Sequence, residues 1–278
     1  MNGRGGGRRR RTIAFAVLAA ILGVNGLSAG DRPFPYELKT KDLWLGPGGV
    51  GLFALGASLH SGHGEISLEE ILALDRNDVN AFDRPATRNW SIEWADRSDV
   101  SRDIVVFSAL LATTVPPLVR GKWSETLTVT VMFAEAYAIM GGVTYLTKVA
   151  AARKRPYLYN TDLTPEERLG AEDDPKSSFF SGHAASAFTA AVFLSKVFTD
   201  VHGRSVWSTL VWASSLSLAA YTSFARVKAG VHFPTDVIAG AAVGFAIGYL
   251  VPVVHKKGRS DRVQVAVGPN MVSLNLRF

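Results

Sequence analysis

The sequence contains no cysteine, which excludes disulfides, thiolate catalysis and cysteine-based metal sites. It also lacks a long basic face with interleaved aromatic residues and any zinc-ligand spacing, so no nucleic-acid partner is expected. No cluster of carboxylates suits a two-metal site. The chain is instead rich in apolar residues, since 47% of its 278 residues are hydrophobic and the mean hydropathy is +0.14. This composition favours a membrane-associated chain that is long enough to bury a full core.

The first thirty residues have the layout of an export signal. Arg4 and the run 8–11 of arginines precede an apolar stretch at 12–24, and small residues suited to cleavage follow at 28–30. We assign 1–30 to a signal peptide or an uncleaved signal anchor, with the arginines on the cytoplasmic side. These arginines and a few short basic clusters account for most of the formal net charge of +6.

Six apolar segments follow. The first, 43–59, contains five glycines and is interpreted as an interfacial or packed segment. The others are 104–119, 126–147, 184–198, 206–224 and 237–254, and several are marginal against the roughly 20 residues that a bilayer span needs. Glu135 is interpreted as facing the bundle interior, and Lys196 as a lysine that snorkels to the interface.

These segments predict an all-α fold, a membrane-embedded bundle of about five to six core helices. We divide the chain into a polar or interfacial region at 31–102, a helical core at 103–256 and a tail at 257–278. If the leader and the last five segments cross the membrane, basic residues at 120–122, 202–204 and 255–259 all lie on the cytoplasmic side, as the positive-inside rule requires. The motifs described next then face the periplasm.

The tail alternates apolar with polar or small residues, which predicts a small C-terminal β-hairpin. The apolar positions on either side of the turn at 268–270 are Val263, Val265, Val267, Val272, Leu274, Leu276 and Phe278. A lone hairpin is marginal in water, so this one should dock on the helices or on a second copy. If the hairpin is exported, the last apolar helix does not span and the protein is a soluble periplasmic bundle.

The stretch from Ala225 to Asp236 carries the strongest chemical signal. Pro234 suits the first turn of a helix, so His232 lies at a helix N-terminus, where unpaired N–H groups and the macrodipole favour anions. Asp236 follows one turn later, where it can reach an imidazole nitrogen and fix the tautomer. Arg226 offers a planar charged fork for phosphate oxygens. Alone, the stretch fits equally well a surface histidine beside a capping aspartate.

Two further stretches repeat this chemistry. Lys148 and Arg155 lie in a basic cluster at the end of an apolar helix, and Pro156 forces Arg155 out of helical geometry. Ser181-Gly182-His183 opens another apolar helix with a hydroxyl, a glycine and a histidine. Together the three stretches describe a pocket for one phosphoryl group.

These residues resemble the three signature motifs of the type 2 phosphatidic acid phosphatase superfamily, which includes lipid phosphatases, bacterial acid phosphatases and vanadium haloperoxidases. They follow the family's order and internal spacing over residues 148–236. Phe180 stands where the family usually has proline, and Ala225 where serine usually precedes the arginine. Neither change removes a charged or nucleophilic group, so we expect an altered rate or fit with activity retained.

The resemblance implies a metal-independent phosphatase that uses a phosphohistidine and no cofactor, with vanadate as an inhibitor. His232, oriented by Asp236, would attack phosphorus in line, and His183 would protonate the leaving alkoxide and then activate water. The equatorial oxygens would be held by Lys148, Arg155, Ser181, Gly182 and Arg226.

The expected substrate is a phosphomonoester or diphosphate, most readily a phosphorylated lipid, at the inner membrane with a periplasm-facing site. The motifs also fit a soluble periplasmic acid phosphatase, a vanadate-dependent haloperoxidase, or a lipid-binding membrane protein without activity. The short chain and its membrane character disfavour the haloperoxidase, and the intact set of charged and imidazole side chains disfavours the inactive protein. Homo-oligomerisation stays open.

Two other polar stretches are interpreted as solvated loops. His60-Ser61-Gly62-His63 repeats Ser-Gly-His but precedes no long apolar helix and lies outside the family's order. The acidic residues between the first two motifs are read in the same way, as loop residues without ligands: Glu166, Glu167, Glu172, Asp173 and Asp174.

Overall fold

The computed structural model describes residues 32–39, 42–61, 65–172 and 174–258, and the backbone of 263–268 and 271–276. The predicted leader at 1–30 lies outside these residues. Six long α-helices form the body of the described chain: α2 (Asp42–His60), α4 (Ile92–Val119), α5 (Trp123–Ala151), α7 (Gly182–His202), α8 (Val206–Lys228) and α9 (Pro234–Val254).

Shorter elements complete the described chain. The helices are α3 (Leu68–Leu72) and α6 (Pro165–Leu169), and the 3₁₀ turns are η1 (Arg76–Asp78), η2 (Arg84–Arg88) and η3 (Pro156–Tyr159). In the tail, β1 (Val263–Gly268) and β2 (Met271–Leu276) pair antiparallel, with Val263 opposite Leu276. The docking predicted for this pair stays a prediction.

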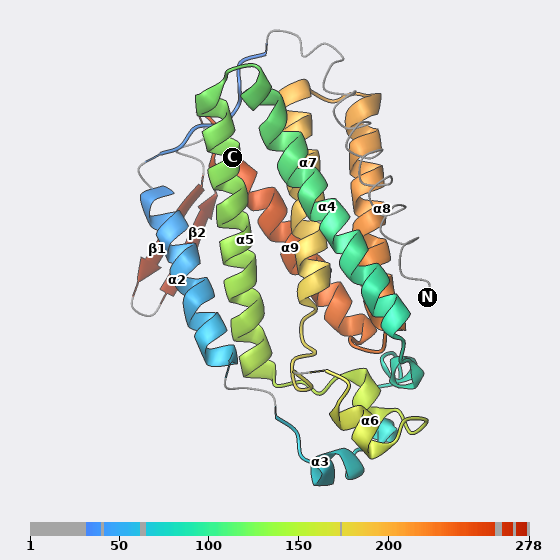
Figure 1. Cartoon of the computed structure of the whole chain (residues 1–278). Helices are drawn as coiled ribbons and strands as arrows, with labels where there is room; N and C mark the ends of the chain where they lie inside the picture. The colour runs from blue at the N-terminus through green and yellow to red at the C-terminus, as the bar shows by residue number, and fades with distance from the viewer. Residues whose placement is uncertain are drawn as a thin grey trace.

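The long helices run side by side, and α3 and α6 lie together at one end of the bundle (Figure 1). Helix α7 packs against α4, α5, α8 and α9 and is buried along most of its length. Its many alanines allow these neighbours to approach closely. The mostly helical architecture expected from the apolar segments is confirmed.

A stripe of glycines sets α9 against α7. Gly240, Gly244 and Gly248 recur every four residues and therefore share one face of α9. A Cβ atom at Gly244 would lie 2.3 Å from the carbonyl oxygen of Ala185, so no larger residue fits there. This contact holds the N-termini of α7 and α9 side by side.

Helices α7 and α9 begin where the sequence predicts, and hydrogen bonds to capping side chains fix both starts. The Ser181 hydroxyl accepts a hydrogen bond from the backbone N–H of Ala184 at 3.3 Å, which caps α7. Pro234 occupies the first turn of α9, and the Asp236 carboxylate accepts from the backbone N–H of Phe233 at 2.9 Å. Arg155 is extended just before Pro156, as predicted.

Four of the described helices are long and apolar enough to cross a membrane: α4, α5 with the η3 turn, α7 and α9. The segment predicted at 206–224 forms α8, which is not among them. Glu135 faces the interior, as predicted, and lies 3.1 Å from His255. The snorkelling predicted for Lys196 is wrong, because its ammonium is buried in an ion pair with Asp200.

Candidate active site

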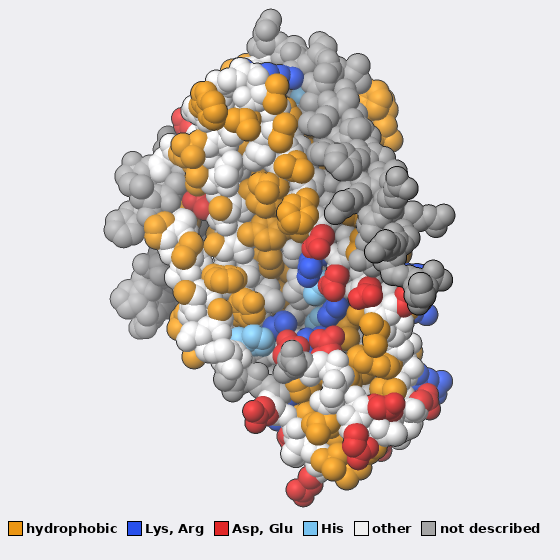
Figure 2. All heavy atoms as spheres, viewed as in Figure 1, with side chains coloured by type: hydrophobic (Ala, Val, Ile, Leu, Met, Phe, Trp, Pro, Cys, Tyr) orange, Lys and Arg blue, Asp and Glu red, His pale blue; other side chains and the backbone are white. Residues whose placement is uncertain are grey.

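The three motifs meet where α5 ends and α7 and α9 begin. Figure 2 shows charged and histidine side chains gathered in one area below a broad apolar face of the bundle. Both predicted helix N-termini reach this area, and the backbone N–H of Ser181 donates to the carbonyl oxygen of Asp236 at 3.1 Å. Gly182 is the first residue of α7 and packs close to Thr144 of α5.

His232 is buried, with 1% of its surface exposed. Its Nδ1 lies 2.7 Å from the backbone carbonyl oxygen of Ser178. Because a carbonyl only accepts, this contact places the proton on Nδ1 and leaves a lone pair on Nε2. The predicted hydrogen bond from His232 to Asp236 is not formed, since Nδ1 and Oδ2 are 3.8 Å apart. A backbone carbonyl therefore orients the imidazole, in a position that sequence spacing cannot reveal.

Asp236 is connected to His232 through Ser178. Its carboxylate accepts from the Ser178 hydroxyl at 2.5 Å and from the Phe233 backbone N–H, and it forms an ion pair with Arg153. Ser178 therefore connects the two groups, with its hydroxyl on Asp236 and its carbonyl on His232.

Asp83, from the region predicted to be polar or interfacial, is fully buried beside this cluster. It accepts from the Thr235 backbone N–H at 3.0 Å and from Arg153 Nη2 at 2.8 Å. Burial alone would raise the pKa of Asp83, but hydrogen bonds from Thr235, Arg153 and Asn80 lower it overall, so the carboxylate is charged. No sequence pattern marks Asp83, because Arg153 and Thr235, which connect it to the candidate site, lie 70 and 152 residues away.

Gly230 shows how closely this region packs on the third motif. Its φ is +79°, and a Cβ atom there would lie 2.0 Å from the carbonyl oxygen of Asn89. Only glycine combines this backbone conformation with such a close approach. The segment around Asn89 thus braces the loop that presents His232.

His183 lies between an acceptor and a donor supplied by α4. Its Nε2 is 2.6 Å from Asp99 Oδ1 and 2.7 Å from Arg102 Nη1. Nε2 donates to Asp99 when it is protonated and accepts from Arg102 when it is not. This arrangement suits a group that gains and loses a proton. Sequence reasoning missed both α4 residues.

The three predicted cations surround His232. Arg155 and Arg226 are buried, and Nε of Arg226 has no hydrogen-bond partner among the described residues. Burial, followed by the charges of Arg155, Arg226 and Lys148, holds the pKa of His232 well below its ordinary value. At neutral pH the imidazole is therefore uncharged, with its Nε2 lone pair available.

Asp174 contradicts the prediction of a solvated acidic loop. Its carboxylate forms an ion pair with Arg155 and lies 3.5 Å from Lys148 Nζ and 3.8 Å from His60 Nε2. His60 also lies beside these residues, because α2 ends there next to α5. The His60 ring is 5.1 Å from the ring of Tyr145. The Asp174 carboxylate thus contacts Lys148 and Arg155, two of the predicted phosphate ligands.

The other residues of the two stretches predicted to be solvated loops differ in their surroundings. Glu172 lies 3.6 Å from Arg155, whereas Glu166 and Glu167 are exposed on α6. His63 and Asp173 lie outside the described residues. The two departures from the family pattern, Phe180 and Ala225, are both buried apolar side chains.

Residues 129–260 match the model of the PAP2 superfamily. This region of the chain, just under half of its length, is therefore similar to that superfamily. The match contains all three motifs and confirms the resemblance drawn from them. Asp83, Asp99 and Arg102 precede the matched region, although their side chains contact it.

Two relatives come from Porphyromonas gingivalis. A lipid A 4'-phosphatase is 34% identical over 85 residues, which cover 31% of this chain and 33% of the relative. A lipid A 1-phosphatase is 28% identical over 113 residues, which cover 41% of this chain and 21% of the relative. The chain thus spans a third or less of the length of these two proteins.

One solved structure also resembles the chain. It is a transmembrane PAP2 type phosphatidylglycerolphosphate phosphatase from Bacillus subtilis, with 19% identity and a TM-score of 0.46. The match covers 77% of this chain and 98% of the other.

Proposed function

We propose that the protein is a metal-independent phosphatase of phosphorylated lipids that works through a phosphohistidine on His232. The observation that carries the proposal is the state of this residue. A buried, uncharged imidazole, with its proton held on Nδ1, is surrounded by the cations Lys148, Arg155 and Arg226. A phosphoryl group bound to these cations would meet the Nε2 lone pair.

The reaction would proceed in two steps. Nε2 of His232 attacks phosphorus, the bond from phosphorus to the leaving oxygen breaks, and His183 gives its proton to that oxygen. Water then attacks the phosphohistidine while His183 takes a proton from it, which releases inorganic phosphate and restores His232. Asp99 would stabilise the protonated form of His183, and Arg102 the neutral form.

A lipid substrate is supported by the names of the two P. gingivalis relatives and by the apolar helices beside the site. A periplasmic site is supported by the helix directions. The connections at 120–122 and 203–205 and the end of α9 lie at the end of the bundle away from the motifs. These connections are basic, so the positive-inside rule would place them in the cytoplasm and the site opposite.

Phosphate release in detergent with excess chelator tests this function. The panel contains phosphatidic acid, phosphatidylglycerol phosphate, undecaprenyl diphosphate, lipid A and one soluble aryl phosphate, each with and without vanadate. We expect vanadate-sensitive release from at least one lipid. Release from the aryl phosphate alone would instead indicate a broad-specificity acid phosphatase. Absence of release, together with halogenation of a dye in the presence of vanadate and peroxide, would indicate a haloperoxidase.

Asp174→Asn should tighten inhibition by vanadate. The carboxylate of Asp174 competes with an anion for Lys148 and Arg155. Because such partly exposed ion pairs contribute about 0.2–1 kcal/mol, the inhibition constant should fall by roughly 1.4- to fivefold. Glu166→Gln is the matched control, since it removes an exposed charge nearby and should leave inhibition unchanged. Weaker inhibition in Asp174→Asn would mean that Asp174 positions the cations and does not compete for them.

A further inference from the structure

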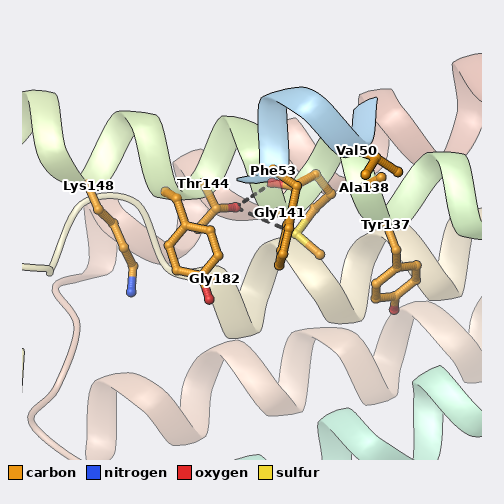
Figure 3. Close-up of a pocket in the computed structure, with 10 residues that line it drawn as sticks. Val50, Phe53, Tyr137, Ala138, Gly141, Thr144, Lys148 and Gly182 are labelled. Carbon is orange, nitrogen blue, oxygen red and sulfur yellow. Dashed lines mark hydrogen bonds between the residues drawn. The ribbon is translucent and has the colours of Figure 1, made fainter. Parts of the chain in front are cut away.

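An apolar groove of about 430 Å³ leads away from the phosphate-binding lysine. On α5 it is lined by Tyr137, Gly141, Thr144 and Lys148, whose spacing of three and four residues places them on one face. Figure 3 shows Lys148 at one end and Tyr137, Ala138 and Val50 at the other. The groove therefore runs along α5 from the candidate site toward the middle of the bundle.

Helix α2 forms the second wall. The two helices run in the same direction, since residue numbers rise together along both. Gly46, Gly49 and Gly56 of α2 face, in that order, Glu135, Ile139 and Tyr145 of α5. Phe53 covers Gly141, where a Cβ atom would lie 2.6 Å from the phenyl ring. The small residues allow α2 to lie close to α5 and leave the groove between them.

The groove offers an apolar surface with a single charge. The Thr144 hydroxyl donates to the Met140 carbonyl at 2.7 Å, and the Tyr137 hydroxyl donates to the Ser186 carbonyl at 3.0 Å. Both hydroxyls thus have partners within the protein. Of the residues that line the groove, only Lys148 is charged, and it lies at the end that joins the candidate site.

The length of the groove matches one leaflet of a bilayer. Lys148 and Tyr137 are eleven residues apart on α5, which corresponds to about 16 Å along the helix axis. The hydrocarbon core of a bilayer is about 30 Å thick, so one leaflet contributes about 15 Å. A lipid whose phosphate reaches Lys148 would therefore extend its chain to the level of Tyr137.

We propose that this groove binds one hydrocarbon chain of the phosphorylated substrate, and that Val50 and its neighbours at the far end set the longest chain accommodated. The inference rests on the proposed function, and it assigns the recognition of substrate to α2 as well as to the phosphate-binding residues. The charge at one end and the leaflet-length apolar surface together suit a phosphate and one extended chain of the same lipid.

Turnover of linear alkyl phosphates tests the groove. With homologues that are soluble as monomers, we expect KM to fall with each added methylene, by up to about fourfold per fully buried group, until the chain fills the groove. Val50→Trp should stop this fall at a shorter chain and leave kcat and the shortest homologues unchanged. Val50 is 60% exposed, so the larger side chain should not prevent folding.

Leu55→Trp is the matched control, because Leu55 is also exposed on α2 but does not line the groove. It should leave the chain-length profile unchanged. The same profile in the wild type and in Val50→Trp would overturn the proposal while leaving the phosphatase function intact. Absence of turnover of every homologue by the wild type would count against the function itself.

A second measurement does not depend on turnover. An alkyl phosphate with a diazirine at the chain terminus is photolysed with the wild-type protein, and the labelled peptides are identified by mass spectrometry. Label on α2 near Val50 and on α5 near Tyr137, displaced by unlabelled alkyl phosphate, would support the proposal. Label spread over α4, α8 and α9, or label that competitor does not displace, would show that the chain stays in the surrounding lipid or detergent.

Discussion

His232→Ala is expected to abolish phosphate release, with a loss in kcat on the order of 10⁴-fold or more. The variant lacks the nitrogen that would form the bond to phosphorus, while Lys148, Arg155 and Arg226 would still be present to bind the phosphoryl group. The substrate should therefore bind with little change and fail to react. Rates with the best lipid of the panel, together with binding of vanadate, separate these two effects.

Chemical trapping makes the test specific for the nucleophile. Quenching the wild type with ³²P-labelled substrate should yield a phosphoprotein that is stable to alkali and labile to acid, as a phosphohistidine is, and His232→Ala should yield none. His202→Ala, at the other end of α7, is the control for loss of an imidazole. Near-normal turnover by a folded His232→Ala protein would rule out the mechanism.

Asp236→Asn is expected to lower kcat on the order of 10²-fold, with a smaller effect on KM. Asparagine retains one oxygen but places an amide N–H₂ where a carboxylate oxygen now meets either Arg153 or the Phe233 N–H beside Ser178, so a donor would face a donor. Ser178 would shift, and its carbonyl would no longer hold the proton on Nδ1 of His232. The cations proposed to bind phosphate are untouched, which explains the small change expected in KM.

Ser178→Ala distinguishes this route from the direct contact that spacing alone suggests. If Asp236 acts through Ser178, the alanine variant should share part of the defect, and the double variant should be no slower than Asp236→Asn. If Asp236 instead acts directly on His232, Ser178→Ala should be nearly normal. Steady-state rates of the three proteins, with thermal unfolding to verify that each is folded, decide between the two.

Some of the candidate site was predictable because its signals are local. A capping serine and a proline in the first turn set where α7 and α9 begin, and the residues around them carry the same information in any fold. The apolar segments likewise predicted the helices, since each reflects burial along its own length. The spacing of the three motifs then identified the cations and the two histidines.

The errors share a different cause. Asp174 and His60 lie in polar stretches without periodicity, where sequence offers no reason to prefer a buried contact to solvent. Lys196 in an apolar helix looks the same in sequence whether it reaches the interface or pairs with Asp200 in the interior. Asp174 and His60 were placed by partners from distant segments, whereas Asp200 is only four residues from Lys196 and is enclosed by Tyr36 and Lys256 from elsewhere in the chain.

The sequence by itself therefore determined where the apolar helices lie, where α7 and α9 begin, and which cations and histidines the candidate site brings together. Only the tertiary structure decided what surrounds them: the Ser178 carbonyl on His232, Asp99 and Arg102 on His183, Asp83 beneath α9, and α2 as a wall of the groove. The physical reason is separation along the chain. Capping and periodicity act within a few residues, whereas these contacts join residues more than fifty positions apart and exist only when the helices pack.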